Sequence, residues 1–387
     1  MKLNNLCPIC SCKNVEPFLT RKCVPIHQNM VIKNQESAKK SLRGDIELFV
    51  CSSCGFIYNN DFNSELLLYD NQYDNTQSCS PLFSKYLHER ITHLVVDHET
   101  RNKKIIEIGC GKGQFLKELC KFENVGIGFD PSYSDIDDTN KNDNKICFKK
   151  QLFNESCNQF LVDVVICRHV IEHIPNPVHL LKTIKNTLIN SSHVKIYFET
   201  PCVEWILNNR VIWDFFYEHC SYFNKNSLTT LFEISGFKVE NIEHTFDGQY
   251  LWLEASIPQK RCKITKNSQQ IKNISFDFFK KENEYINKWK IKIQKMLSIG
   301  KVAVWGAGAK GVTFVNLIDP NYEWIDCVVD LNPNKQGHYV SGTGHPIVSY
   351  QELVSRGVRT AILMNPNYYT ENYNILNKEH INIELVE

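Results

Sequence analysis

The segment that most constrains the fold of this chain is a short apolar strand that runs into a glycine-rich turn. Residues 105–108 are apolar except for the acid Glu107, glycines follow at positions 109, 111 and 113, and a helical pattern comes next. Glycines at this spacing let a backbone approach a ligand closely. A second apolar strand, residues 125–129, ends at Asp130, where a carboxylate can accept hydrogen bonds from a ribose diol. The segment predicts an α/β sheet with a nucleotide-like ligand at its strand ends.

Three regions of different chemistry divide the 387 residues, a length that exceeds one ordinary globular core. Cysteine pairs mark the N-terminus, strands alternate with helices in the middle, and a second α/β unit begins near residue 300. We expect an N-terminal domain at residues 1–75 and a core at 76–257. A linker with a connecting helix should follow at 258–300, and a C-terminal domain at 301–387.

Polar stretches predict the connections. Residues 258–273 are polar and basic without an apolar period, which predicts a linker. Apolar residues recur at helical spacing over residues 276–297, which predicts an amphipathic helix. Residues 133–145 are too polar for a core, so we expect a surface loop there.

The composition excludes several classes of function. Lys and Arg number 44 against 43 Asp and Glu, and this net charge of +1 provides no field for general nucleic-acid binding. No run approaches the roughly 20 apolar residues of a membrane span, and the first residues lack the apolar stretch of a secretory signal. We therefore expect a cytoplasmic protein whose 16 cysteines are thiols or metal ligands rather than disulfides.

Two C-x2-C pairs predict a metal site near the N-terminus. Cys7 with Cys10, and Cys51 with Cys54, can offer four thiolates to one tetrahedral Zn²⁺. A redox C-x-x-C normally occurs once rather than twice, which favours a structural zinc. Four thiolates leave no position for water, so the metal would support folding rather than catalysis. Two other thiols and an imidazole are near enough in sequence to compete as ligands: Cys12, Cys23 and His27.

The pattern E-x-G-x-G-x-G, followed by an acid at the end of the next strand, resembles the S-adenosylmethionine site of class I methyltransferases. A dehydrogenase would more often present G-x-G-x-x-G at this place and remains an alternative. The resemblance implies cofactor-binding residues on this strand and the strands that follow it: Glu107, Gly109, Gly111, Gly113, Asp130, Pro131, Arg168 and His169.

Residues 163–177 resemble the fourth strand and the following turn of the same fold. His169, Glu172 and His173 also spell H-x-x-E-H, an inverted zinc-protease signature. A protease site needs a long helix that carries both histidines on one face, whereas a buried strand precedes this motif and Pro175 interrupts it. We therefore expect His169 at the methionine end of the cofactor, or as a structural histidine at the end of the strand.

With the cysteine pairs in front and the glycine-rich residues 306–311 behind, nearly the whole chain resembles the three-domain nucleotide-sugar C-methyltransferases. In that family a histidine after a glutamate, in a segment like Y-E-H-x-S-Y-F, removes the proton next to a 4-keto group. Residues 217–223 match this segment, and an imidazole suits the task because its pKa lies near operating pH. The resemblance implies a general base and its surroundings at His219, Glu218, Tyr222 and Tyr73, with His173 as the second candidate base. Core packing is the alternative role for His219 and Tyr73.

Two departures from the family affect the substrate. Residues 246–252 replace a Gly-Gly-Glu-like segment. Gly308 completes a G-x-G-x-x-G with Asp330 about 20 residues on, which makes a nicotinamide site arguable. A domain that closes over the nucleotide or sugar is favoured, because a methyl transfer needs no hydride. Its expected substrate-binding residues are Lys310, Asp330, Asn332 and Lys335.

The sequence therefore predicts an α/β chain: a class I methyltransferase Rossmann-like core, a small N-terminal zinc-binding domain and a C-terminal Rossmann-like domain. The expected function is S-adenosylmethionine-dependent C-methylation of a nucleotide-linked keto-sugar, a small-molecule substrate, with no nucleic-acid or membrane partner. O- or N-methylation of a related small molecule is one alternative. A zinc-bearing, dinucleotide-binding protein without catalytic activity is the other.

Overall fold

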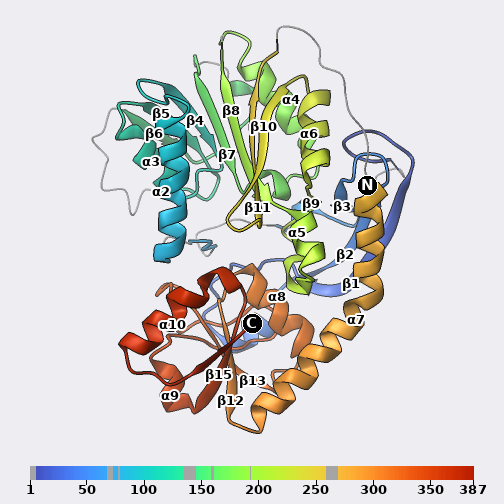
Figure 1. The fold of residues 1–387 in the computed structure, drawn as a ribbon, viewed down its shortest axis with the longest axis vertical. Coiled ribbons are helices and arrows are strands. Elements are labelled where there is room, and N and C mark those ends of the chain that lie inside the picture. Colours follow the sequence, from blue (N-terminus) through green and yellow to red (C-terminus); the bar gives the residue numbers. More distant parts are fainter. Residues whose placement is uncertain are drawn as a thin grey trace.

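The computed structural model describes residues 6–67, 73–76, 79–134, 145–157, 161–191, 193–258 and 269–387. Its strands form three sheets, one for each region of the chain. In Figure 1 the middle region lies above the C-terminal region, and the N-terminal strands lie to one side of both. Most of the expected surface loop at 133–145, and most of the expected linker at 258–273, lie outside the described residues.

The N-terminal sheet takes one strand from the middle of the chain. Its antiparallel order is β1-β2-β3-β9, with β1 at Val15–Pro25, β2 at Arg43–Cys51, β3 at Ile57–Asn59 and β9 at Ser221–Tyr222. A short helix, α1 (Gln35–Lys39), lies between the first two strands and is capped by the side chain of Asn34. The sheet therefore joins the cysteine pairs to the segment that contains His219.

The middle sheet has seven strands in the order β10-β11-β8-β7-β4-β5-β6. Strands β4 to β8 are parallel to one another, and β11 runs antiparallel to β8 and to β10. The parallel strands are short apolar runs such as KIIEI and VVICR, as expected for a sheet covered on both faces. The bounds are β4 Lys104–Ile108, β5 Val125–Phe129, β6 Ile146–Lys149, β7 Val164–Arg168, β8 Lys195–Pro201, β10 Lys238–Thr245 and β11 Tyr250–Ser256.

Five helices accompany this sheet among the described residues: α2 (Pro81–Val96), α3 (Gln114–Cys120), α4 (Pro177–Thr187), α5 (Val203–Asn208) and α6 (Lys225–Ile234). This strand order, with its antiparallel β11, is the Rossmann-like arrangement of class I methyltransferases, so the predicted fold class is confirmed. The strand order reverses between the neighbouring strands β4 and β7. In sheets of this kind, ligands bind beyond the carboxyl ends of the strands at such a switch point.

The C-terminal sheet is parallel throughout, in the order β14-β13-β12-β15-β16. Its elements are β12 (Lys301–Trp305), α8 (Ala309–Ile318), β13 (Ile325–Val329), β14 (Ile347–Val348), α9 (Glu352–Arg356), β15 (Val358–Leu363), α10 (Tyr369–Lys378) and β16 (Glu384–Val386). Short 3-10 helices cover Ser64–Leu66, Glu155–Cys157, Ile171–His173, Ile212–Asp214 and Pro366–Tyr368.

A long helix, α7 (Gln269–Leu297), connects the C-terminal sheet to the N-terminal strands along one side of the molecule (Figure 1). The expected linker at 258–273 was wrong for residues 269–273, which are helical. Their sequence is polar, but Ile271 is only 3% exposed and packs with the apolar cluster that also holds residues of the N-terminal sheet. Tertiary packing therefore extends the helix beyond its apolar period.

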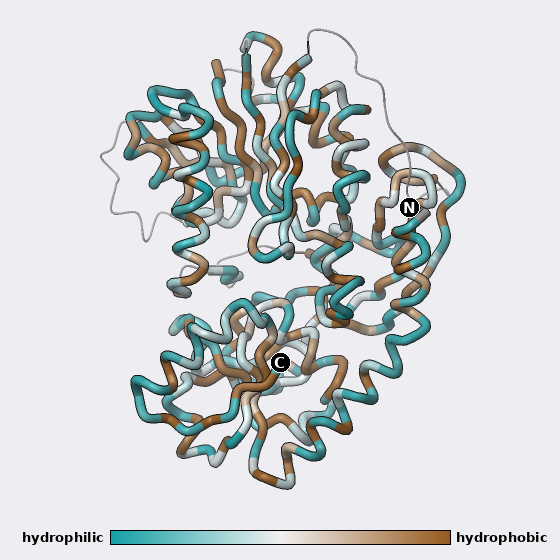
Figure 2. The backbone as a smooth tube through the Cα atoms, in the orientation of Figure 1, coloured by the Kyte–Doolittle hydropathy of each residue, from teal (hydrophilic) through white to brown (hydrophobic). Residues whose placement is uncertain are grey.

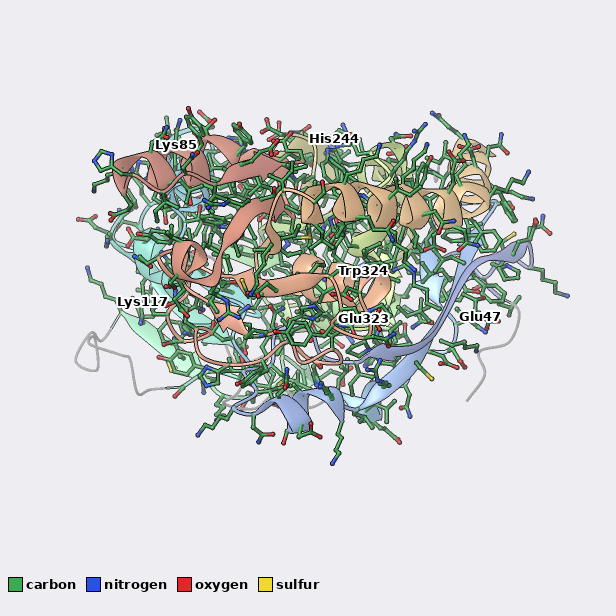
Figure 3. All side chains as sticks on the ribbon, turned by 90° about the horizontal axis from the view of Figure 1, so that it is seen from below. Glu47, Lys85, Lys117, His244, Glu323 and Trp324 are labelled. Carbon is green, nitrogen blue, oxygen red and sulfur yellow. The ribbon has the colours of Figure 1, made fainter. Side chains whose placement is uncertain are left out.

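Hydrophobic segments concentrate in the strands of the sheets, whereas α7 is mostly hydrophilic (Figure 2). Charged side chains such as Lys117 on α3 and Glu47 on β2 lie on opposite sides of the molecule in the view from below (Figure 3). None of the helices that the described residues form has the length and apolar character needed to cross a bilayer.

Candidate active site

The glycine turn after β4 has the backbone that its sequence predicted. Gly109 and Gly111 have positive φ angles of 70° and 53°. A Cβ atom on Gly109 would lie 2.1 Å from Cγ2 of Val170, whereas nothing lies within 4 Å of the corresponding position on Gly111. The turn therefore needs glycine for its conformation, and at Gly111 it faces open space where a ligand can approach.

Two carboxylates lie beside this turn. Asp130 follows β5, and its Oδ2 accepts a hydrogen bond of 2.8 Å from the amide of Gly111, while its Oδ1 accepts one from the amide of Ser132. Glu107 on β4 is 3% exposed, and its Oε2 has no hydrogen-bond partner among the described residues. Burial raises the pKa of Glu107 to about 8. An orphaned polar atom beside an open glycine turn fits a ligand with polar groups, as S-adenosylmethionine has.

Arg168 ends strand β7, and His169 follows it directly. Arg168 pairs with Glu199 at 2.7 Å and lies over the ring of Phe115, which fixes the strand end. His169 has a φ of 52° and lies 3.4 Å from carboxylate oxygens of both Glu199 and Glu172. Burial alone would lower the pKa of His169, but the two carboxylates raise it by more than burial lowers it. The net pKa is about 9.

A cavity of about 280 Å³ lies between the middle and C-terminal regions, and the N-terminal region contributes to its wall. The predicted residues that line it are Tyr73, His169, His173, Glu218, His219, Lys310, Asp330 and Lys335. Of the residues predicted for the cofactor, those of the glycine turn, Asp130 and Pro131 are outside this lining, and they lie along the same carboxyl edge of the parallel sheet.

His219 lies just before β9, and its ring packs against Phe216 and His173 with centroids 4.1 Å and 4.8 Å away. Burial, followed by the nearby His173 and His169, holds the pKa of His219 well below its ordinary value. Burial also lowers the pKa of His173, whose Nδ1 lies 2.9 Å from the carbonyl oxygen of Glu218. Both imidazoles are therefore neutral at pH 7, and a neutral imidazole can accept a proton.

Glu218 ties the N-terminal region to the cavity. It is 1% exposed, its Oε1 accepts a hydrogen bond of 3.0 Å from the amide of Gln28, and its Oε2 accepts one of 3.2 Å from the hydroxyl of Tyr73. Burial raises the pKa of Glu218 to about 7. The structure thus brings Tyr73, Glu218 and His219 to one wall, although the segment just before Tyr73, residues 68–72, lies outside the described residues.

Among the predicted catalytic and substrate-binding residues, two do not line the cavity. Tyr222 is 2% exposed in an apolar cluster, and its hydroxyl donates to the carbonyl oxygen of Phe216. It pairs with Ile57 in the N-terminal sheet, and its ring lies edge-on to that of His219 with centroids 6.1 Å apart, so Tyr222 lies behind the expected base rather than in the cavity lining. Asn332 is 2% exposed, and its Oδ1 accepts a hydrogen bond from the amide of Asn334.

The H-x-x-E-H motif is not on a long helix. Its residues follow the buried strand β7 and end in a 3-10 helix of three residues, Ile171–His173, as the context of the motif predicted. Glu172 accepts a hydrogen bond from Thr200 and lies near His173 and His219. Sequence reasoning noticed Glu172 only as part of the rejected protease signature and missed that it faces the cavity.

The C-terminal domain presents the start of α8 to the cavity. Gly308 precedes this helix without a side-chain cap, so its first amides are open to a ligand. Lys310 pairs with Asp214 at 2.9 Å, and Lys335 donates to Asn29 and to the carbonyl oxygen of Ala307. The pair of Lys310 and Asp214, like the bond between Gln249 and Asn365, crosses from one domain to the other and has no local sequence signal.

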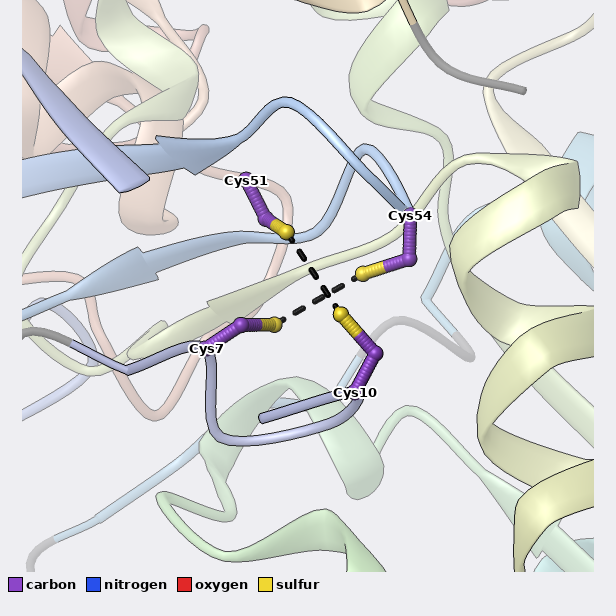
Figure 4. Close-up of side chains that lie close together, drawn as sticks. All are labelled: Cys7, Cys10, Cys51 and Cys54. Atoms are coloured by element: carbon purple, nitrogen blue, oxygen red, sulfur yellow. Dashed lines mark hydrogen bonds between the residues drawn. The ribbon is translucent and has the colours of Figure 1, made fainter. Parts of the chain in front are cut away.

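The four paired cysteines converge at a separate place (Figure 4). Sγ of Cys7 lies 3.6 Å from Sγ of Cys54, and Sγ of Cys10 lies 3.6 Å from Sγ of Cys51. A disulfide needs about 2.05 Å. Thiolates around a tetrahedral zinc with bonds of about 2.3 Å lie about 3.8 Å apart, so the geometry suits that ion. The competing candidates Cys12, Cys23 and His27 are outside this cluster.

Two family matches cover most of the described chain. Residues 83–242 match the family described as Methyltransferase domain, and residues 264–381 match the C-methyltransferase C-terminal domain. Residues 83–242 are thus similar to methyltransferase domains. The prediction of an S-adenosylmethionine-dependent methyltransferase enzyme is confirmed for its domains, and neither match supports the dehydrogenase or protease alternative.

Curated relatives of the methyltransferase domain are more distant. The ubiquinone biosynthesis O-methyltransferase of Coxiella burnetii is 26% identical over 110 residues, which are 27% of this chain and 43% of that protein. The enzyme of the same name from Glaesserella parasuis is 24% identical over 119 residues, or 28% and 48% of the two chains. This chain thus spans less than half the length of these relatives.

Solved structures are similar at low identity. Magnesium protoporphyrin IX methyltransferase from Synechocystis, with bound SAH, is 17% identical with a TM-score of 0.36 over 48% of this chain and 88% of that one. The 1,6-didemethyltoxoflavin-N1-methyltransferase of Burkholderia thailandensis is 10% identical with a TM-score of 0.34 over 49% and 81%.

Proposed function

We propose that the chain transfers a methyl group from S-adenosylmethionine to a carbon atom of a nucleotide-linked keto-sugar, with His219 as general base. The observation that carries the proposal is the position of His219, in a cavity between a methyltransferase sheet and a C-methyltransferase C-terminal domain. Neither ring nitrogen of His219 makes a hydrogen bond to another residue that the structure describes, so the imidazole is available to a substrate.

The chemistry of carbon methylation requires such a base. A carbon atom is a poor nucleophile until the proton beside a carbonyl group is removed and an enolate forms. The neutral imidazole of His219 would accept that proton. When bound, S-adenosylmethionine supplies an electrophilic methyl group, and Glu107, Gly111 and Asp130 are the residues placed to hold it. His169 and Tyr250, which line the cavity next to the ends of β7 and β8, would bound the reacting space.

Residues around His219 would fix its position. The hydrogen bond between His173 Nδ1 and the carbonyl oxygen of Glu218 holds the backbone immediately before the base. Glu218 in turn anchors Gln28 and Tyr73 of the N-terminal region. The hydroxyl of Tyr73, which lines the cavity beside Glu218, would contact a substrate oxygen there.

A diphosphate would fit the side of the cavity that the C-terminal domain forms. The start of α8 offers open amides, and Lys310 and Lys335 lie within the same lining. Phosphate oxygens suit a helix N-terminus together with lysine ammonium groups. Lys310 would exchange its contact with Asp214 for the phosphate. The substrate's nucleotide would thus rest on the C-terminal domain while its sugar faces His219.

The cysteine cluster would support the same site from a distance. We assign a structural Zn²⁺ to Cys7, Cys10, Cys51 and Cys54, because four thiolates complete a tetrahedral shell. Cys51 ends β2, which pairs with β3, and β3 pairs with β9 directly after His219. The metal would therefore stabilise the sheet that holds the base in place.

The test is His219→Asn, with His173→Asn as the matched variant, in the full chain. With a panel of nucleotide-linked 4-keto-sugars and S-adenosylmethionine, His219→Asn should lower turnover by about 10² to 10⁴ while calorimetry shows unchanged cofactor affinity. It should also stop exchange of the hydrogen beside the keto group with deuterated water. Wild-type exchange in His219→Asn, with loss of exchange in His173→Asn, would assign the base to His173. Methylation at oxygen or nitrogen without any exchange would refute carbon methylation.

A further inference from the structure

Three polar side chains meet at the end of α2 that lies away from the cavity. His93 is on α2, His98 follows the helix, and Glu254 is on β11. Nε2 of His93 lies 2.9 Å from Oε1 of Glu254, Nε2 of His98 lies 3.2 Å from the same oxygen, and the two Nε2 atoms are 3.2 Å apart. None of the three lines the cavity, whereas Tyr250 at the other end of β11 does.

We propose that His93, His98 and Glu254 bind a divalent transition-metal ion of the zinc type, at a second site separate from the cysteine cluster. Two imidazoles and one carboxylate are a preferred donor set for Zn²⁺, with water in the fourth position. Ligand atoms on a tetrahedral zinc with bonds of about 2.0 to 2.1 Å lie about 3.3 Å apart. The three measured separations are close to this value and need little movement.

The orientation of His93 supports this assignment. Its Nδ1 lies 2.8 Å from Oδ2 of Asp97, one turn further along α2. If Nδ1–H donates to Asp97, the lone pair of Nε2 points at Glu254 and His98. A carboxylate that orients a metal-binding histidine in this way is the usual outer partner of a zinc ligand. Three lone-pair atoms at these distances repel one another unless protons or a cation lie between them.

A buried hydroxyl beside the cluster is the second, independent observation. Tyr197 on β8 is 1% exposed, its ring contacts that of His98 with centroids 5.3 Å apart, and its hydroxyl has no hydrogen-bond partner among the described residues. An unsatisfied buried hydroxyl on a ring that contacts His98 suits a site that holds a further group, such as a metal-bound water.

The setting allows an ion to enter and stay. The side chains of His93 and His98 are 22% and 20% exposed, so solvent reaches them, while that of Glu254 is 11% exposed and also accepts a bond from Nε1 of Trp252. The nearest cation on the helix, Arg90, is paired with Glu243 at 2.9 Å. Because His93 is on α2 and Glu254 is on β11, the bound ion would link the end of the helix to the strand.

The consequence concerns the opposite end of the same helix. Ser80, which caps α2, lines the cavity, and Tyr86 on α2 bonds to Glu199 and Thr245. A metal ion that fixes one end of α2 would therefore restrain the helix that carries a wall of the active site. This site does not depend on which substrate the cavity takes.

The first experiment counts zinc in the full chain by mass spectrometry after dialysis against a zinc buffer. The double variant His93→Gln with His98→Gln should hold one zinc fewer per chain than the wild type. His88→Gln, on the exposed face of the same helix, is the matched control and should hold as much as the wild type. Asp97→Asn should weaken zinc affinity at this site by about 10- to 100-fold. Equal zinc content in the wild type and the double variant would refute the proposal.

A second experiment needs no variant. Zinc added to wild-type protein should slow the modification of His93 and His98 by diethyl pyrocarbonate, followed by peptide mass spectrometry, while His88 reacts at an unchanged rate. Equal rates for His93 and His98 with and without zinc would overturn the proposal even if the double variant failed to fold. Co²⁺ separates the two metal sites, because thiolate ligands give an intense charge-transfer absorption that a histidine and carboxylate site lacks.

Discussion

Glu218 should make the stability of the cavity wall depend on pH. Its carboxyl group is 1% exposed, and its pKa is about 7 in the folded chain against an ordinary value of 4.5. Because the folded value is the higher one, the protonated form is favoured by folding. The contribution of this carboxyl group to the free energy of unfolding is therefore fully present below pH 4.5, and it is lost as the pH rises towards and through 7. The Glu218→Gln variant, which stays neutral at every pH, should not show this loss.

The two pKa values set the size of the effect. Linkage between pH 5 and pH 8 gives a loss of about 2.5 kcal/mol for the wild type relative to Glu218→Gln, or roughly a 70-fold change in an opening equilibrium. Glutamine preserves the shape of the side chain. Its carbonyl oxygen can accept from Gln28, and its amide can donate to the hydroxyl of Tyr73. The difference should therefore be small at pH 5 and grow with pH.

Hydrogen exchange followed by mass spectrometry is the appropriate assay, because a chain of several domains need not unfold in one step. Protection factors of the amides of Gln28 and Cys220 report the opening of this wall. Glu89→Gln on α2, where the side chain is 54% exposed, is the control and should show no pH-dependent difference from the wild type. A constant difference between Glu218→Gln and the wild type from pH 5 to pH 8 would show that burial does not govern this carboxyl group.

Three further outcomes test other parts of the chain. Asp130→Ala should weaken S-adenosylmethionine binding by about 1.5 to 3 kcal/mol in calorimetry, because the ribose loses a charge-assisted acceptor, and wild-type affinity would show that the cofactor binds elsewhere. Cys51→Ser should release zinc from the cysteine cluster and lower the melting temperature, while the protein that stays folded still binds the cofactor. Metal analysis that finds no zinc at the cluster of the soluble wild type would contradict this prediction. Lys310→Met should weaken the binding of uridine diphosphate more than that of S-adenosylmethionine. Equal affinity for the nucleotide in the variant and the wild type would show that the phosphate does not bind at the start of α8.

Local patterns in the sequence predicted those parts of the site that depend on a few consecutive residues. The glycine turn and Asp130 follow from strand ends and backbone conformation, both of which are properties of a few consecutive residues. The cysteine cluster follows from paired ligands, and the structure brings the two pairs together as expected. Both predictions depend on residue type and spacing rather than on distant contacts.

Contacts between distant segments could not be predicted in the same way. The ion pair of Lys310 and Asp214 joins two domains, and the sequence near either residue contains no pattern that predicts the contact. The motif around His219 gives the spacing of Tyr222 but not the direction of its side chain. The residues after His219 form a strand, and pairing with Ile57 places Tyr222 in an apolar cluster rather than in the cavity lining. Residues 269–273 were misplaced because their polar composition hides one buried contact, at Ile271.

The pairing of β9 with β3 also bears on how the chain is made. The N-terminal sheet lacks its fourth strand until Ser221 and Tyr222 have left the ribosome, long after β1, β2 and β3 have been synthesised. During that interval β3 is an open edge that can pair with another chain. Closure of a loop this long is slow and costs entropy, so the N-terminal sheet should be among the last to mature. Pulse proteolysis of nascent chains halted before and after residue 222 would reveal the step.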